Sequence, residues 1–171
     1  MNGGRWVALI LIAIALVGGA RLVQLRLERQ GLGAQLLQAV EAGDRESAQR
    51  LIQRGASTNV LDAQGRSPLF IAAGRGDLEM VRLLVDNGAF PDGAGPDQQT
   101  PLMAAVSAPE QKNAKEIASL LLGRGASPKA VDAARVSVEE HARRGGASAE
   151  LLAEIEKWRG VWDRREKIRV D

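Results

Sequence analysis

The sequence of 171 residues contains no cysteine, which excludes disulfides, thiolate metal sites and cysteine nucleophiles. Aromatic residues are also scarce, with three Trp, two Phe and no Tyr. A core built from β-sheets usually relies on aromatic and β-branched side chains, whereas this chain takes most of its apolar residues from Leu, Ala, Val and Ile. That composition favours packed helices.

An excess of one charge is missing as well, since 23 basic residues face 21 acidic ones. This near-balance gives no support for a nucleic-acid partner. The single histidine, His141, has no second His or Cys to complete a metal site, and we interpret it as a lone surface residue. We interpret the serines as caps and turns, because no His–Asp setting accompanies them. We therefore expect a non-catalytic chain without metal, cofactor, nucleic acid or small-molecule substrate.

One long uncharged run, WVALILIAIALVGGA, occupies residues 6–20. As a helix it is roughly 22 Å long, and extension to Val23 gives roughly 27 Å against a hydrocarbon core of roughly 30 Å. We therefore expect residues 6–23 (Trp6 to Val23) to form a single-pass membrane anchor, in the bacterial inner membrane. One Arg before the run and three soon after it favour a cytoplasmic C-terminal side, but short N-terminal signals often ignore that rule.

A cleaved signal peptide is the competing interpretation of the same residues. Arg5 would supply its basic start, residues 7–17 its apolar core, and Gly18 and Ala20 the small residues before a cut. Cleavage would leave a periplasmic or secreted protein. A buried soluble helix is the third interpretation, but the run is apolar on every face and a domain of this size could not surround it.

Residues 24–33 follow as a linker. From residue 21 to residue 30 the pattern RLVQLRLERQ alternates leucine with charge, as in a helical stalk. We expect Gly31 and Gly33 to break this helix and to mark the start of a separate domain.

An internal repeat of 33 residues follows the linker. Ser-Pro-Leu at 67–69 recurs as Thr-Pro-Leu at 100–102, and Gly-Asp at 43–44 recurs at 76–77. Ser67 is a good N-cap before Pro68, so a first helix is predicted over 68–74. Asp77 then caps a second helix over 78–87. Gly88 ends it, because glycine tolerates the left-handed conformation best.

The stretch GRSPLFIAAGRGDLEMVRLLVDNGAF (residues 65–90) resembles the ankyrin repeat, as does QTPLMAAV (residues 99–106). The resemblance implies an all-α solenoid of about four helix pairs, two of them caps. Phe70 and Met103 stand where the family usually has His, and loop 91–99 lacks the usual Asp-x-x-Gly turn. The expected units are 34–66, 67–99, 100–136 (with four extra residues, 109–112) and 137–159, followed by a charged tail at 160–171. We expect Trp158 to pack under the last unit and the tail to be a solvated end. A small contact of the tail with a partner or a membrane surface is the alternative.

The resemblance also implies recognition of a protein partner through the concave face and the loop tips of the solenoid. A structural subunit of a membrane complex, held mainly by its N-terminal helix, remains the alternative. In the ankyrin register, the side chains offered to a partner are Gln38, Glu41, Val60, Leu61, Asp62, Gln64, Ile71, Arg75, Asp97, Gln98, Ala104, Ser107, His141 and Arg144.

Overall fold

A computed structural model of the chain describes residues 31–93, 95–107 and 113–168, with side chains as far as Arg164. The predicted membrane segment at 6–23, most of the linker and the extra residues at 109–112 lie outside the described residues. Within the described ranges, no helix combines the length and the apolar character that a membrane crossing requires.

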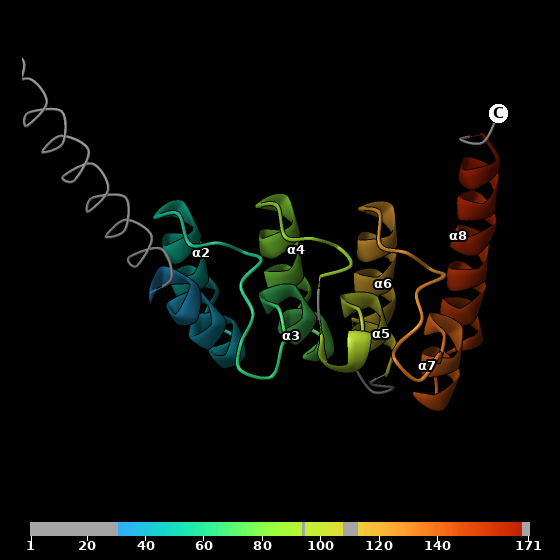
Figure 1. Cartoon of the computed structure of the whole chain (residues 1–171), viewed down its shortest axis with the longest axis horizontal. Coiled ribbons are helices and arrows are strands. Elements are labelled where there is room, and N and C mark those ends of the chain that lie inside the picture. Colours follow the sequence, from blue (N-terminus) through green and yellow to red (C-terminus); the bar gives the residue numbers. More distant parts are fainter. Residues whose placement is uncertain (1–30, 94, 108–112, 169–171) are drawn as a thin grey trace, which may run out of the picture.

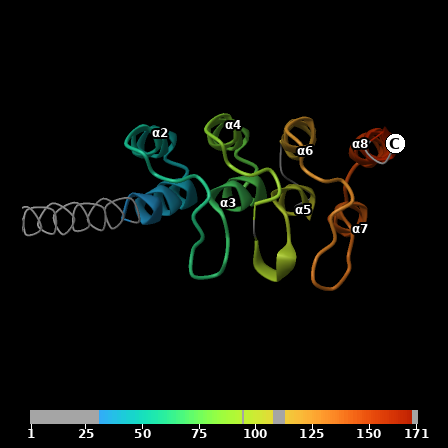
Figure 2. The same ribbon diagram turned by 45° about the horizontal axis from the view of Figure 1, so that its top comes forward.

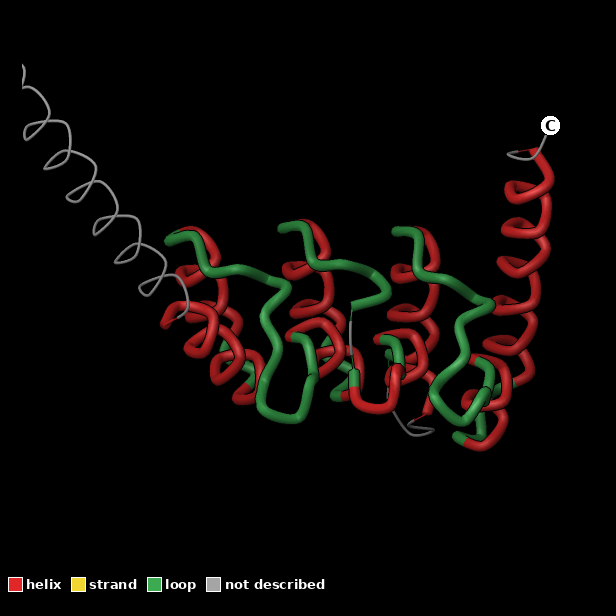
Figure 3. Tube along the Cα trace, in the orientation of Figure 1, coloured by secondary structure: helices red, strands yellow, loops and turns green. Residues whose placement is uncertain are grey.

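The described residues form helix pairs that stack side by side in chain order (Figure 1). Figure 2 shows two rows, in which the second helix of each pair forms one row and the first helix the other. Hairpin-like loops project from the row of first helices and join successive pairs (Figures 2 and 3). The first helices are residues 31–42, α3 (Pro68–Gly74), α5 (Pro101–Ser107) and α7 (Val138–Arg144). The second helices are α2 (Arg45–Gln53), α4 (Leu78–Asp86), α6 (Ala114–Gly123) and α8 (Ala149–Ile168). A 3₁₀ turn, η1, covers Pro96–Gln98.

Side-chain caps decide where the helices begin. The Ser67 hydroxyl accepts the N–H of Phe70 at 3.2 Å, and the Asp77 carboxylate accepts the N–H of Met80 at 2.9 Å. Both predicted caps are therefore confirmed, and each satisfies a backbone donor that the first helical turn leaves open. The α4 helix ends at Asp86, one residue before its predicted end, and Gly88 follows with φ of 83° as expected.

The core is a continuous layer of aliphatic side chains between the two rows. Leu69 and Leu102, one repeat apart, are 1% and 0% exposed, and Leu84 and Leu121 are fully buried in the second helices. Such a layer exists only when neighbouring pairs stack, because one pair alone cannot cover its own apolar faces.

Gly33 is helical, although we expected it to break the helix, and it lies within residues 31–42. Gly31 is the first residue that the structure describes, so the expected break before it lies outside the described residues. Gly33 is buried against Val60, and a Cβ at Gly33 would approach the Val60 Cγ1 atom to 2.6 Å. The glycine therefore allows the first helix to pack closely on the loop after α2, and this contact compensates for its poor helix propensity of about 1 kcal/mol.

The last helix continues beyond the predicted unit boundary at 159, because α8 runs through Gly160 to Ile168. Lys129 helps to hold this extension, since its Nζ atom lies 2.5 Å from the Asp163 carboxylate. Trp158 is partly buried against the core, as predicted, and its indole N–H donates to Glu154 at 2.9 Å. Part of the expected tail is therefore the second half of the closing helix.

Candidate functional site

A groove lies between the first helix, residues 31–42, and α3 of the second pair. It has a volume of about 360 Å³, and its floor includes the apolar side chains of Phe70 and Ile71. Gly74 also lines the groove, next to α5, since a Cβ there would lie 3.7 Å from the Ala104 Cβ atom. The charged residues Glu41, Arg66 and Arg75 complete the lining.

One wall of the groove is a fixed ion-pair network. The Arg66 guanidinium lies 2.6 Å from the Asp62 carboxylate and 2.6 Å from the Glu41 carboxylate. Hydrogen bonding to Asp62 raises the pKa of Arg66 above its ordinary value. Burial alone would raise the pKa of Asp62, but hydrogen bonds from the Arg66 backbone and side chain and from the Gln64 N–H outweigh it and lower that pKa. Because these charged groups neutralise one another, they offer little net charge for binding a partner.

Arg75 differs from Arg66 because it has no carboxylate partner in the part of the chain that the structure describes. It is exposed and follows α3 as the C-cap residue. Its Nη2 atom lies over the turn of the first pair, 3.4 Å from the position that a Cβ on Gly43 would take. Arg75 therefore places an uncompensated positive charge at the edge of an apolar floor.

Ile71 corrects one sequence-based expectation. We expected its side chain to be presented to a partner, but it is only 6% exposed and belongs to the core. The α3 helix packs against both α4 and α5, and these neighbours leave little of the Ile71 side chain open. Ile71 thus supports the floor of the groove without offering a large contact surface.

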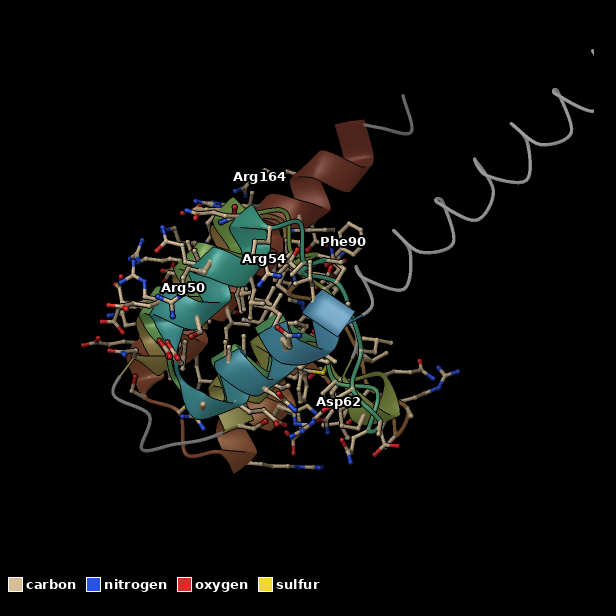
Figure 4. All side chains as sticks on the ribbon, turned by 90° about the vertical axis from the view of Figure 1, so that its left-hand side faces the viewer. Arg50, Arg54, Asp62, Phe90 and Arg164 are labelled. Carbon is tan, nitrogen blue, oxygen red and sulfur yellow. The ribbon has the colours of Figure 1, made fainter. Side chains whose placement is uncertain are left out.

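The other residues that we expected to contact a partner differ in their exposure and in their position on the array. Asp62 lies on the loop side of the array, opposite Arg50 of α2 (Figure 4). Asp97 and Gln98 form the turn of the second loop, between α4 and α5, with positive φ angles of 53° and 60°. The Asp97 carbonyl accepts the N–H of Ala133 in the third loop, between α6 and α7, which joins the two loops. Exposed residues are Gln38, Glu41, Leu61, Gln64, Asp97, Gln98, Ser107 and Arg144, and intermediate ones are Val60, Asp62, Ala104 and His141.

His141 is not a lone surface histidine, which corrects a second expectation. Its side chain is only 13% exposed, and its Nε2 atom lies 2.9 Å from the carboxylate of buried Asp132. Its Nδ1 atom lies 3.3 Å from the Ser107 hydroxyl. These residues come from α5, the third loop and α7, and only the stacking of two units brings them together. The spacing of 34 residues between Ser107 and His141, close to one repeat, is the signal that could have identified the contact.

The Ser107–His141–Asp132 group has the residue types of a nucleophilic triad but a different geometry. The Ser107 hydroxyl donates to the Met103 carbonyl at 2.7 Å, so its proton is directed away from the histidine. In catalytic triads His Nε2 takes the serine proton and the carboxylate holds Nδ1, whereas here the two nitrogens are reversed. The group is therefore best explained as a connection between two repeat units.

Comparisons with known proteins agree with the helix-pair architecture. A profile described as ankyrin repeats (3 copies) matches residues 36–132. The chain is 38% identical over 115 residues to "Ankyrin repeat, SAM and basic leucine zipper domain-containing protein 1" of Ornithorhynchus anatinus, a match that covers 66% of this chain and 24% of that protein.

Two bacterial relatives match shorter segments. An ankyrin repeat-containing protein of Treponema pallidum is 41% identical over 56 residues, which is 33% of this chain and 19% of that protein. An ankyrin repeat protein of Rickettsia felis is 41% identical over 56 residues, which is 33% of this chain and 89% of that protein. The profile covers more than half of the sequence, and the structure has the helix pairs of the repeat. The chain belongs to the ankyrin repeat family.

Proposed function

We propose that this protein is a membrane-tethered, non-catalytic module that recognises a protein partner through its concave groove and loop tips. Ankyrin repeats are general protein–protein interaction modules. The observation that carries the proposal is the position of Arg75, an exposed cation without a carboxylate partner among the described residues, beside the apolar floor formed by Phe70 and Ile71.

The groove suggests the chemistry of the partner's contact. Arg75 can form a bidentate pair with a carboxylate, while the Phe70 ring, which also lines the groove, can cover an apolar side chain. Arginine is also enriched among the residues that dominate binding energy at interfaces. A partner segment with an acidic residue next to an apolar one would fit this arrangement.

The tether in this proposal is the apolar run at 6–23, which the sequence supports and which lies outside the described residues. An anchor there would hold the repeats beside a membrane, for which we propose the bacterial inner membrane. A cleaved signal would give a periplasmic or secreted protein with the same groove.

The test compares Arg75→Ala with Arg54→Ala in the full chain. Arg54 is a matched control because it is also exposed, is also the C-cap of its helix, and has no carboxylate partner among the described residues. Partner capture from solubilised membranes of the source cells, measured by quantitative mass spectrometry, should weaken about tenfold for Arg75→Ala. Arg54→Ala should capture as the unmodified chain does, and both variants should unfold at nearly the unmodified denaturant concentration.

A different result would favour the structural-subunit alternative. In that case capture survives Arg75→Ala and is lost when residues 6–23 are replaced by an unrelated membrane span. That outcome would remove the groove from the proposal and leave the repeats as a spacer.

A further inference from the structure

The first loop, between α2 and α3, and the third loop, between α6 and α7, are closed by equivalent aspartates. The Asp62 carboxylate accepts the N–H of Arg66 at 2.8 Å, and the Asp132 carboxylate accepts the N–H of Val136 at 2.8 Å. The backbone N–H of each aspartate in turn donates to the carbonyl four residues later, at 3.0 Å and 3.1 Å. The two loops therefore have the same local fold.

The side-chain partners of these aspartates differ in one respect. Asp62 is paired with the Arg66 guanidinium at 2.6 Å, and arginine stays charged at every pH that a protein tolerates. Val136 stands where Arg66 would be and offers no charge, so Asp132 takes His141 from the following helix instead, at 2.9 Å. Histidine is the side chain that gains and loses its charge near neutral pH.

The groups that face the two ring nitrogens of His141 decide which protonation state of the imidazole fits. The Ser107 hydroxyl uses its proton on the Met103 carbonyl, so its oxygen faces Nδ1 as an acceptor. Asp132 faces Nε2 as a second acceptor, because hydrogen bonds from the Val136 N–H and from His141 outweigh burial and hold the pKa of Asp132 below its ordinary value. Two acceptors therefore face two ring nitrogens, and only the charged imidazolium carries two N–H donors.

We propose that the third loop, residues 127–136, is held by a proton-dependent clamp, in which the charged form of His141 ties Asp132 to Ser107 and loss of a ring proton loosens the loop. The neutral ring can donate to Asp132 alone. Its bare Nδ1 then faces the Ser107 oxygen, unless the Ser107 hydroxyl gives up its bond to Met103. The first loop has no such sensitivity near neutral pH, because Arg66 does not titrate there.

The charged groups of α7 that lie near the clamp are already paired, and Arg135 is an exposed cation of the third loop. The α5 helix, PLMAAVS, carries no charge. On α7, Glu140 is paired with Arg144 at 2.9 Å, and Glu139 is paired with Arg143 and, from α8, with Arg159 at 3.1 Å. Asp132 is thus the carboxylate that contacts the ring within the described ranges. Glu110 and Lys112, which follow Ser107 in the chain, lie outside those ranges.

The experiment uses the full chain in detergent micelles with ¹⁵N-labelled histidine, in which His141 is the only ring observed. Ring ¹⁵N shifts report whether one or two nitrogens are protonated, and backbone hydrogen exchange reports the loop. As rising pH removes the second proton from the ring, the protection factor of the Val136 amide should fall about tenfold, while that of the Arg66 amide should stay constant. Protection factors remove the intrinsic pH dependence of exchange, and the first loop serves as the internal control.

The Ser107→Ala variant separates the clamp from ordinary packing. It removes the oxygen opposite Nδ1, so the bare Nδ1 of a neutral ring no longer faces another acceptor. The fall in Val136 protection should therefore shrink to about threefold or less. The clamp is overturned if Val136 and Arg66 protection change in parallel with pH, or if Val136 protection falls equally in Ser107→Ala. It is also overturned if the ring loses its second proton while Val136 protection does not change.

Discussion

The side chain of Asn59 joins the first repeat unit to the backbone at Phe90 of the second. Its amide oxygen accepts the N–H of Phe90 at 2.8 Å, and its amide nitrogen donates to the Gly88 carbonyl at 3.0 Å. Asp92 occupies the same position one unit later, where its carboxylate accepts the N–H of Ser127 at 2.9 Å. Each contact connects neighbouring units, so these side chains help to set the spacing of the array.

Removing the Asn59 side chain should therefore weaken the first junction. We expect Asn59→Ala to lower the free energy of unfolding by about 0.5–1.5 kcal/mol, because it removes two exposed hydrogen bonds whose remaining groups, the Phe90 N–H and the Gly88 carbonyl, can bond water instead. Gln53→Ala, at an exposed position at the end of α2, is the control and should change stability by less than about 0.5 kcal/mol. Urea unfolding measures both. Equal effects of the two changes would show that the junction does not depend on Asn59.

Leu84 and Leu83 are adjacent leucines with different burial in α4. Leu84 is 0% exposed, whereas Leu83 is only partly buried. We expect Leu84→Ala to cost about 2–5 kcal/mol of unfolding free energy, the range for a buried leucine that leaves a cavity. Leu83→Ala should cost less than half as much, since its site is open to water. Denaturant unfolding that ranks the two variants in the opposite order would mean that α4 presents a different face to its neighbours.

The Asp62 network gives a pH dependence with a definite sign. Hydrogen bonds from the backbone and side chain of Arg66 outweigh burial and lower the pKa of Asp62, so its stabilising contribution is present above the ordinary carboxyl range. That contribution is lost as the pH falls through the lowered pKa of the folded state.

We expect Asp62→Asn to cost about 1–3 kcal/mol at neutral pH, the range for losing a charged hydrogen-bond partner. The difference from the unmodified chain should shrink progressively as the pH falls below the ordinary carboxyl pKa. Urea unfolding at about pH 7 and about pH 3 measures it. A difference that persists undiminished in acid would point to packing, not charge, as the role of Asp62.

The apolar run at 6–23 predicts the behaviour of the whole chain in fractionation. Full-length protein should sediment with membranes and resist carbonate extraction, because these residues, among which only Arg21 is charged, can just span the hydrocarbon core as a helix. A chain that begins at residue 31 should be soluble and keep its helical circular dichroism. Detection of Arg21 as the mature N-terminus would identify the run as a cleaved signal instead.

Features that depend on local sequence were predicted well. Ser67 and Asp77 cap the helices that they were expected to cap, and Gly88 adopts the expected left-handed conformation, because each acts on backbone groups within a few residues. The α3 helix has its predicted bounds for the same reason. The packing of Trp158 could also be predicted, since a large apolar side chain near the end of the array has one neighbouring core to cover it.

The sequence by itself determined the repeat period, the helix pairs and their caps, because hydrophobic spacing and backbone capping act over short distances. Only the tertiary structure decided that Gly33 lies inside a helix against Val60. It likewise decided that Ile71 supports the floor of the groove and is too buried to offer a large contact surface. It also decided that His141 meets Asp132 and Ser107. Gly33 meets Val60 within the first unit, but only after the chain has folded back on itself. The outcomes for Ile71 and His141 depend on how closely one unit stacks on the next. That distance is set by the packing of side chains from different repeats, and no single stretch of the sequence specifies it.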